Sequence, residues 1–160
     1  GVDLLGQKQF SAAVAANAKA LRLDPNSATA RGNLLATVNN WAVAEASAGR
    51  FRAAADLLRD GLAIDPNYEM FKNNDRHVHR QWIAQLCRAE EFAQALDVLA
   101  AAARQRPEEA AFLRARLDVY RLWARKRLEA GRATEAQAVL ARWLQLGEEF
   151  EEGGDDASDA

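Results

Sequence analysis

Apolar positions along this chain recur at one long, constant interval. The aromatic residue at Phe10 returns as Phe51 and Phe92, and 51−10 and 92−51 are both 41. The same interval relates a column of tryptophans and a column of alanines: Trp41, Trp82 and Trp123, and Ala13, Ala54, Ala95 and Ala136. A fixed period of this length is typical of stacked repeats, in which no unit can bury its apolar face alone. The pattern therefore predicts an array of similar units.

Prolines and glycines divide each unit into helices. The three prolines, Pro25, Pro66 and Pro107, keep the same spacing, since 66−25 and 107−66 are both 41. A proline disfavours the helical conformation of the residue before it, so a helix should end ahead of each one. Gly49 and Gly131 suit the left-handed conformation that follows a helix end. The predicted helices cover residues 7–23, 27–48, 50–64, 68–89, 91–105, 108–130 and 132–146.

Composition supports a helical fold. Apolar residues make up 49% of the chain, and alanine and leucine dominate over β-branched residues, which favours helices over strands. The expected fold class is all-α, with about three and a half repeats and about seven helices in antiparallel pairs. The repeat domain is expected over residues 1–147, as a half unit at 7–26 and full units at 27–67, 68–107 and 108–147.

The second half of each unit resembles a tetratricopeptide repeat. The segment 49–66 has glycine at the turn, then an aromatic residue, small residues alternating with a bulky one, and proline; these are Gly49, Phe51, Ala54, Leu58, Gly61 and Pro66. Asn40-Trp41-Ala42 also fits the first helix of that family, and the resemblance covers residues 7–146. It implies a right-handed α-solenoid whose first helices line a concave groove. The function it implies is a non-enzymatic scaffold for protein–protein interaction.

The period is longer than the family's. A tetratricopeptide repeat has 34 residues, and 41−34 leaves 7 extra residues in the first helix of each unit. Seven residues are close to two helical turns, so the buried face keeps its phase. HEAT-like repeats, whose range of periods includes this length, are the alternative architecture.

The two ends of the array differ from its middle. The first unit has only its second helix, because six residues precede Gln7. In the last unit Trp143 replaces the small residue found at Ala20, Gly61 and Ala102, which should block a further helix and end the stack. The segment 148–160 has the composition of an acidic, disordered tail or linker. Because the sequence begins at Gly1 rather than at Met, we expect it to be a fragment of a longer chain.

Charge is divided unevenly along the chain. Residues 148–160 hold seven acidic and no basic residues, so residues 1–147 carry 21 basic against 23−7 = 16 acidic side chains, a net charge of +5. With the triplet Arg125-Lys126-Arg127 this makes nucleic-acid binding a hypothesis, but no aromatic recognition motif accompanies it. No apolar run reaches the ~20 residues of a membrane span. A cytoplasmic location is expected, with an exported one left open.

Few residues could support catalysis or metal binding. Asp75 and His79 share a helical face, but no third ligand lies at helical spacing, and His77 points elsewhere. Cys87 is expected to be a small packing residue rather than a reactive thiol. The tryptophan column is expected to fill the core rather than form an aromatic ladder. We therefore expect no enzymatic activity, no cofactor and no metal.

Exposed positions on the first helices form the candidate partner-binding set. Its members are Asn39, Asn73, His77, Arg80, Arg114, Asp118, Arg121 and Arg125. The last four lie on one helical face, where arginines can bind a carboxylate through their forked geometry. The alternative is that they form solvated pairs with one another. The asparagines could bind a ligand backbone or make ordinary interhelical hydrogen bonds.

Two functions follow from these features. The first is a scaffold that docks an acidic protein or peptide segment in its concave groove. The alternative is a structural or regulatory arm of a larger enzyme or signalling protein, which self-associates through its exposed terminal helices. Trp143 is a second candidate contact with a partner, because a terminal helix has no successor to cover it.

Overall fold

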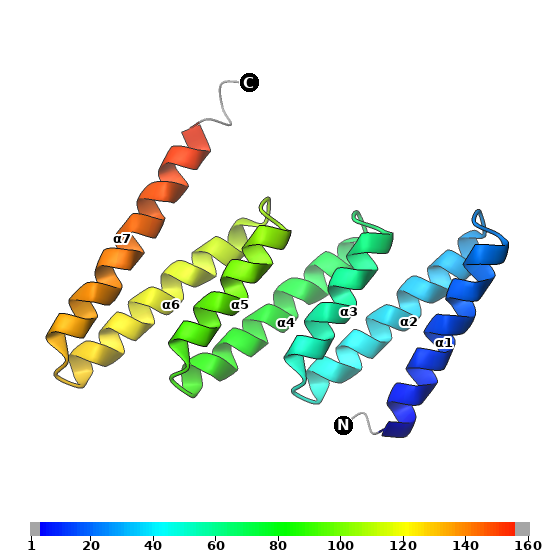
Figure 1. The fold of residues 1–160 in the computed structure, drawn as a ribbon, viewed down its shortest axis with the longest axis horizontal. Helices are drawn as coiled ribbons and strands as arrows, with labels where there is room; N and C mark the ends of the chain where they lie inside the picture. Colours follow the sequence, from blue (N-terminus) through cyan, green and yellow to red (C-terminus); the bar gives the residue numbers. More distant parts are fainter. Residues whose placement is uncertain (1–3, 156–160) are drawn as a thin grey trace. The chain divides into compact units, whose positions relative to one another are not determined.

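The chain forms consecutive α-helices, as the sequence predicts (Figure 1). The computed structural model describes the backbone of residues 4–155 and the side chains of residues 5–148. This part contains seven helices and no strand: α1 (Leu4–Leu23), α2 (Ala28–Ser47), α3 (Phe51–Ile64), α4 (Glu69–Arg88), α5 (Phe92–Gln105), α6 (Ala110–Glu129) and α7 (Ala133–Asp155). The prediction of an all-helical repeat protein is confirmed.

The turns after α2, α4 and α6 share one backbone geometry. The residue in the left-handed region is Gly49 (φ 76°), Glu90 (φ 58°) or Gly131 (φ 73°). In each turn the next backbone N–H bonds back to a carbonyl of the last helical turn: Arg50 to Glu45 at 3.0 Å, Glu91 to Leu86 at 2.9 Å and Arg132 to Arg127 at 2.8 Å. This is the Schellman arrangement, which satisfies carbonyls that the helix end leaves unpaired. Glu90 adopts the same left-handed conformation although it lacks the conformational freedom of glycine.

The proline turns use side chains to hold the chain between helices. Asp24 Oδ1 accepts the backbone N–H of Asn26 at 3.2 Å, and Asp65 Oδ1 accepts that of Asn67 at 3.0 Å. Ser27 then caps α2, its hydroxyl oxygen accepting the N–H of Ala30 at 3.3 Å. Such caps satisfy the free amides at a helix start.

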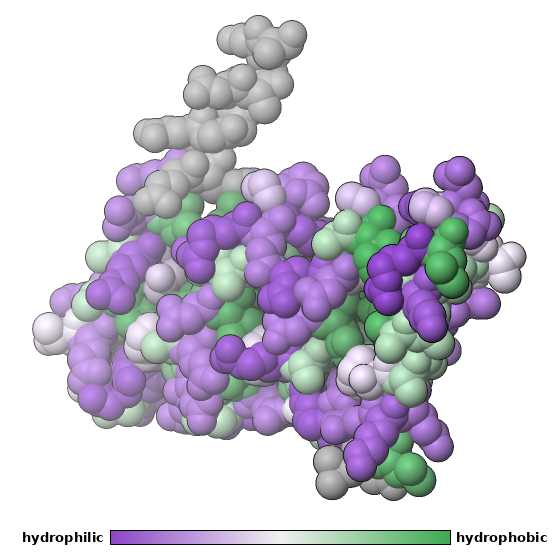
Figure 2. Space-filling view, turned by 45° about the vertical axis from the view of Figure 1, so that its right-hand side comes forward, coloured by the Kyte–Doolittle hydropathy of each residue, from purple (hydrophilic) through white to green (hydrophobic). Residues whose placement is uncertain are grey.

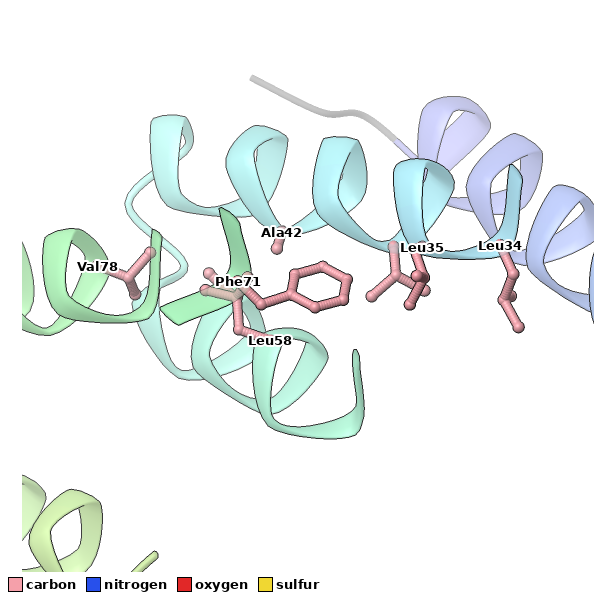
Figure 3. Packing of buried hydrophobic residues seen from close by; sticks show 8 residues of the cluster. Leu34, Leu35, Ala42, Leu58, Phe71 and Val78 are labelled. Carbon is pink, nitrogen blue, oxygen red and sulfur yellow. The ribbon is translucent and has the colours of Figure 1, made fainter. Parts of the chain in front are cut away.

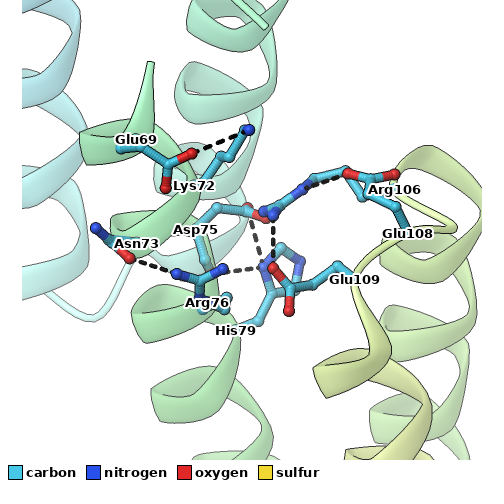
Figure 4. Close-up of polar contacts among 9 residues, drawn as sticks. All are labelled: Glu69, Lys72, Asn73, Asp75, Arg76, His79, Arg106, Glu108 and Glu109. Atoms are coloured by element: carbon cyan, nitrogen blue, oxygen red, sulfur yellow. Dashed lines mark hydrogen bonds and ion pairs between the residues drawn. The ribbon is translucent and has the colours of Figure 1, made fainter. Parts of the chain in front are cut away.

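The third proline turn has an arginine in the place of these aspartates. Its guanidinium reaches across the turn, with Nη2 of Arg106 2.7 Å from Oε2 of Glu109 (Figure 4). The backbone carbonyl of Arg106 accepts the N–H of Glu109 at 3.0 Å. The third turn therefore has the same backbone hydrogen bond as the other two, although an arginine–glutamate pair replaces the aspartate contact.

The last helix is longer than the sequence predicts. The end expected at Leu146 is wrong, because α7 continues to Asp155. No proline stands at position 148, where the period would place one, and the glutamates that follow are good helix formers. Residues 148–155 of the expected tail therefore lie in a helix, and residues 156–160 lie outside the described residues. At the other end α1 begins at Leu4, three residues before the predicted start at Gln7 (7−4 = 3).

The chain divides into two compact units, Gly1–Trp82 and Ile83–Ala160. In the first unit α1 packs against α2 and α2 against α3, and most of α4 belongs to it. In the second unit α5 packs against α6 and α6 against α7. Each unit is thus built from helices that are neighbours along the chain.

A cluster of apolar side chains forms the core of the first unit (Figure 3). Phe71 of α4 and Leu58 of α3 are fully buried in it. Gly61 lets the Phe71 ring approach closely, since a Cβ at this glycine would lie 2.6 Å from the ring. The cluster consists of Leu34, Leu35, Val38, Ala42, Ala54, Leu58, Phe71 and Val78.

The second unit repeats these packing roles one or two periods later. Leu99 and Phe112 are buried there as Leu58 and Phe71 are in the first unit. The alanine column is fully buried at Ala54, Ala95 and Ala136.

The tryptophan column packs in an equivalent way in both units. The Trp41 ring stacks on Phe10 at 6.1 Å between centroids, and the Trp123 ring stacks on Phe92 at 5.9 Å. Trp41, Trp82 and Trp123 are all half-buried. These contacts support a packing role for Trp41 and Trp123, although none of the three rings is fully buried.

Candidate functional site

A row of exposed arginines runs along α6 in the second unit. Arg114, Asp118, Arg121 and Arg125 are spaced by four, three and four residues, which places them on one face of the helix. All four are exposed, as expected. We call these four residues the arginine face.

The ion pairs within the arginine face are loose. Nη1 of Arg121 lies 3.9 Å from Oδ1 of Asp118, and Nε of Arg125 lies 3.7 Å from Oε1 of Glu129. Both distances exceed those of a hydrogen bond. The side chains of Arg121 and Arg125 are 68% and 67% exposed, and pairs between exposed charges contribute little to stability. The guanidinium groups can therefore turn to an external carboxylate at small cost.

Two of the other three basic residues of α6, Lys126 and Arg127, lie near acidic or aromatic side chains of the same unit. The guanidinium of Arg127 lies over the Trp123 ring at 5.9 Å, and its Nε is 3.5 Å from Glu135. Lys126 lies 3.9 Å from Glu90 and 3.8 Å from Glu129. Within the triplet at 125–127, Arg127 is half-buried, whereas Arg125 and Lys126 are exposed and make only loose ion pairs.

Three candidate residues lie on α4 in the first unit, and all are exposed. Asn73 Oδ1 accepts a hydrogen bond from Arg76 (Figure 4). Nη2 of Arg80 lies 2.8 Å from Nδ1 of His77. These side chains already make local polar contacts, so a ligand would have to compete for them. The α4 residues and the arginine face belong to different units, and we describe each by itself.

Asn39 does not belong to the exposed set. Its expected exposure is wrong, because it is buried and its Oδ1 accepts a hydrogen bond from Asn74 Nδ2 at 2.6 Å. This bond joins α2 to α4 inside the first unit, and it confirms the ordinary interhelical alternative for these two asparagines. A buried amide requires such a partner, which explains why asparagine is tolerated within a helix here.

Asp75 and His79 form a buried pair one helical turn apart. Nδ1 of His79 lies 3.1 Å from Oδ1 of Asp75 and 2.9 Å from its backbone carbonyl oxygen (Figure 4). The His79 ring also lies against Trp82, at 6.3 Å between centroids. No group of three potential metal ligands occurs among the described residues. Both side chains are buried, so the pair belongs to the interior of the first unit.

A buried carboxylate was missed by the sequence reasoning. Glu45 of α2 accepts hydrogen bonds from Nε1 of Trp41 at 3.0 Å, from Nε2 of Gln7 at 3.3 Å and from Nε of Arg50. The Arg50 hydrogen bond is the main cause that lowers the pKa of Glu45 below its usual value. The only sequence signal is an acidic residue at a position that is Leu86 in the next unit.

Cys87 is half-buried on α4, and burial raises the pKa of its thiol. A raised pKa keeps the sulfur protonated and poorly nucleophilic. Its properties thus fit the packing residue that the sequence predicts.

Comparisons of the chain with protein families, with characterised proteins and with solved structures give no match. None of the helices in the described residues has the length and apolar character needed to cross a bilayer. The evidence for the arginine face as a binding site is therefore its geometry alone.

Proposed function

We propose that the chain is a non-enzymatic scaffold that binds an acidic segment of a partner protein, with the arginine face as its main contact. In this proposal the fold is a tetratricopeptide-type, right-handed α-solenoid of antiparallel helix pairs. The recurring Schellman turns, the buried alanine column and the two Phe–Trp stacks support repeated packing of this kind. The role of the α4 residues is secondary.

The observation that carries the proposal is the exposure of Arg114, Arg121 and Arg125 on one helical face. α6 holds six basic and two acidic side chains, which gives its surface a net positive charge. Arginine binds carboxylates through two parallel hydrogen bonds, so spaced arginines suit a peptide with spaced Asp or Glu residues. Hydrogen bonds to the backbone of a peptide would not by themselves favour an acidic peptide over a neutral one.

The test is binding of a fluorescein-labelled peptide rich in Asp and Glu, followed by fluorescence polarisation. We expect affinity to fall as salt rises, because contacts between exposed charges are screened. The double variant Arg121→Glu/Arg125→Glu should weaken binding by about tenfold or more, since favourable pairs become repulsive.

A matched control separates the site from the overall charge. Arg104→Glu/Arg142→Glu changes the net charge equally at exposed positions of α5 and α7, and should leave affinity within about twofold, because distant exposed charges are screened. Equal losses in both variants would reject the arginine face. Tighter binding of an oligonucleotide than of the peptide would instead favour a nucleic-acid partner.

A further inference from the structure

One side of α7 is exposed where the corresponding side of α3 and of α5 is covered. Leu140 is 37% exposed, whereas its equivalents one and two periods earlier, Leu99 and Leu58, are buried. The same difference recurs at three further positions, where α3 and α5 have buried or half-buried residues and α7 has exposed ones: Ala133, Gln137 and Leu144. α7 therefore exposes surface that both of its counterparts cover.

The helix before α7 adds one more leucine to this exposed surface. Leu128, near the end of α6, is 54% exposed. Its equivalents on α4 and α2, Cys87 and Ala46, are both half-buried. An exposed cluster of large apolar side chains indicates a contact surface. We call the residues of this surface the open face: Leu128, Ala133, Gln137, Leu140 and Leu144.

The first unit shows how the equivalent surface is covered there. Leu58 belongs to an apolar cluster to which α4 contributes Phe71 and Val78, and Ala46 and Leu62 pack against the same cluster. Eighty-two residues later, which is two periods of 41, these three covered positions are Leu128, Leu140 and Leu144. A helix placed on the second unit as α4 is placed on α2 and α3 would therefore cover the open face.

Trp143 restricts which helix can take this place. The Phe71 ring fits against α3 because Gly61 has no side chain, and a Cβ there would lie 2.6 Å from the ring. Trp143 stands at the position that corresponds to Gly61, and its indole nitrogen is buried. A second large ring would overpack this space. The covering helix must therefore carry a small residue where α4 carries Phe71.

Charge complementarity restricts the covering helix further. In the first unit Asn74 of α4 donates a hydrogen bond to Asn39 of α2, at 2.6 Å. The equivalent of Asn39 on α6 is Arg121, since 121−39 is twice 41, and its side chain is 68% exposed. An Asp or Glu in the place of Asn74 would meet this guanidinium, which binds carboxylates well. Basic residues of the arginine face also lie on both sides of Arg121 along the helix.

We propose that the acidic segment bound by the arginine face is an amphipathic helix of a partner protein, which also packs on the open face. Its contact residues follow the spacing of Phe71, Asn74 and Val78 on α4: a small residue, an acidic residue three positions later, and an apolar residue four positions after that. Such a helix buries its apolar side against a complementary surface. The inference rests on the proposed function and adds the conformation and sequence spacing of the partner.

Two fluorescein-labelled peptides test the conformation by fluorescence polarisation. The first has about 20 residues, mainly alanine and glutamate, with alanine, glutamate and leucine at the spacing just given. The second has one central alanine replaced by proline, which breaks a helix and leaves the charge unchanged. The first peptide should bind about tenfold or more tightly than the second. Circular dichroism should show that its helix content rises on binding.

Variants of the chain test the surface. Leu140→Ser/Leu144→Ser changes no charge and should weaken binding of the helical peptide by about tenfold, because apolar contacts are lost. Leu5→Ser/Leu23→Ser is the matched control, at leucines of α1 that are 63% and 79% exposed. They lie on the side of the first unit that Figure 2 turns toward the viewer, where hydrophobic patches lie among hydrophilic side chains. This control should bind as the wild type does, and circular dichroism melting verifies that each variant is folded.

A change of size at Trp143 tests the steric match separately. A peptide with phenylalanine in place of its small contact residue should bind the wild-type chain more weakly than the alanine peptide. Trp143→Ala places at this position the residue that α5 has there, Ala102. This variant should reverse the preference of the chain between the two peptides.

Three results would overturn the inference. The first is equal binding of the helical and the proline-containing peptide. The second is unchanged affinity in Leu140→Ser/Leu144→Ser. The third is a wild-type chain that self-associates in sedimentation velocity and becomes monomeric in that leucine variant, which would assign the open face to a second copy. In each case a loss of peptide binding in Arg121→Glu/Arg125→Glu would still support the proposed function, so the two proposals can fail separately.

Discussion

At the residue scale, Glu45 is a buried charged group of the first unit. Its carboxylate links α1 to α2 through Gln7, and it binds Arg50, the residue just before α3. A buried carboxylate with several donors is stabilised in its charged form. The charge therefore strengthens the fold rather than opposing it.

This gives Glu45 a defined effect on the pH dependence of stability. Its folded pKa is lowered, so its contribution is present above the unfolded pKa, near the usual value of 4.5, and is lost as pH falls through the folded pKa. Glu45→Gln should lower the free energy of unfolding at pH 7 by about 1 to 3 kcal/mol and flatten its dependence below about pH 5.

Urea unfolding of the wild type and the variant at several pH values measures both effects. Glu91→Gln, at an exposed position, is the matched control and should change stability by less than about 0.5 kcal/mol. If the free energies of unfolding of the wild type and of Glu45→Gln changed in parallel with pH, the effect assigned to the Glu45 carboxylate would be contradicted.

Glu90 is a second residue with a specific energetic consequence. It occupies the left-handed region at φ 58°, where Gly49 and Gly131 serve in the other two turns. Glu90→Gly should raise the free energy of unfolding by about 0.5 to 1 kcal/mol, because glycine adopts this conformation without steric cost. The lost ion pair with Lys126, at 3.9 Å between exposed groups, contributes little.

Thermal and urea unfolding of Glu90→Gly measure this gain. Gly49→Ala is the converse variant and should be destabilised, since it puts a Cβ at a positive φ. An unchanged or lower stability of Glu90→Gly would show that the Glu90 side chain stabilises the fold by at least as much as its left-handed backbone conformation costs.

At the element scale, the Phe71 ring is a central part of the contact between α3 and α4. Phe71 is fully buried and lies against the backbone of Gly61. Phe71→Ala should cost about 3 to 5 kcal/mol, because it removes buried apolar contacts and leaves a cavity. Urea unfolding followed by circular dichroism checks the value.

The neighbouring Met70→Ala is the control for Phe71→Ala. Met70 is on the same helix and half exposed, so its loss should change stability by less than about 1 kcal/mol. A similar cost for the two variants would mean that Phe71 is not a central packing residue.

The sequence predicts these elements well wherever a chemical signal marks their ends. Pro25, Pro66 and Pro107 and the residues at 49, 90 and 131 locate the helix boundaries to within a residue or two. The end of α7 could not be predicted, because the missing proline removes the stop signal and acidic composition alone does not distinguish a solvated helix from a disordered tail.

The candidate site is predicted less completely, and Asn39 shows why. Helical spacing places Arg114, Arg121 and Arg125 on one face, and these are exposed as expected. Adjacent helical positions differ by about 100°, so a small error in the assumed rotation moves Asn39 from groove to interface. Its partner Asn74 is distant in sequence, and only packing reveals it.

At the scale of the whole molecule, the two compact units carry different polar chemistry. The arginine face lies on α6 in the second unit, whereas the buried Glu45 and the hydrogen bond between Asn39 and Asn74 lie in the first.

The tryptophans are divided equally between the two compact units. Trp41 and Trp82 belong to the first, and Trp123 and Trp143 to the second. The indole N–H of Trp41 is bound to a carboxylate, whereas those of Trp123 and Trp143 have no hydrogen-bond partner among the described residues. Replacing either pair by phenylalanine would leave an intrinsic fluorophore in one unit only. Emission spectra could then follow the melting of each unit separately, without any attached dye.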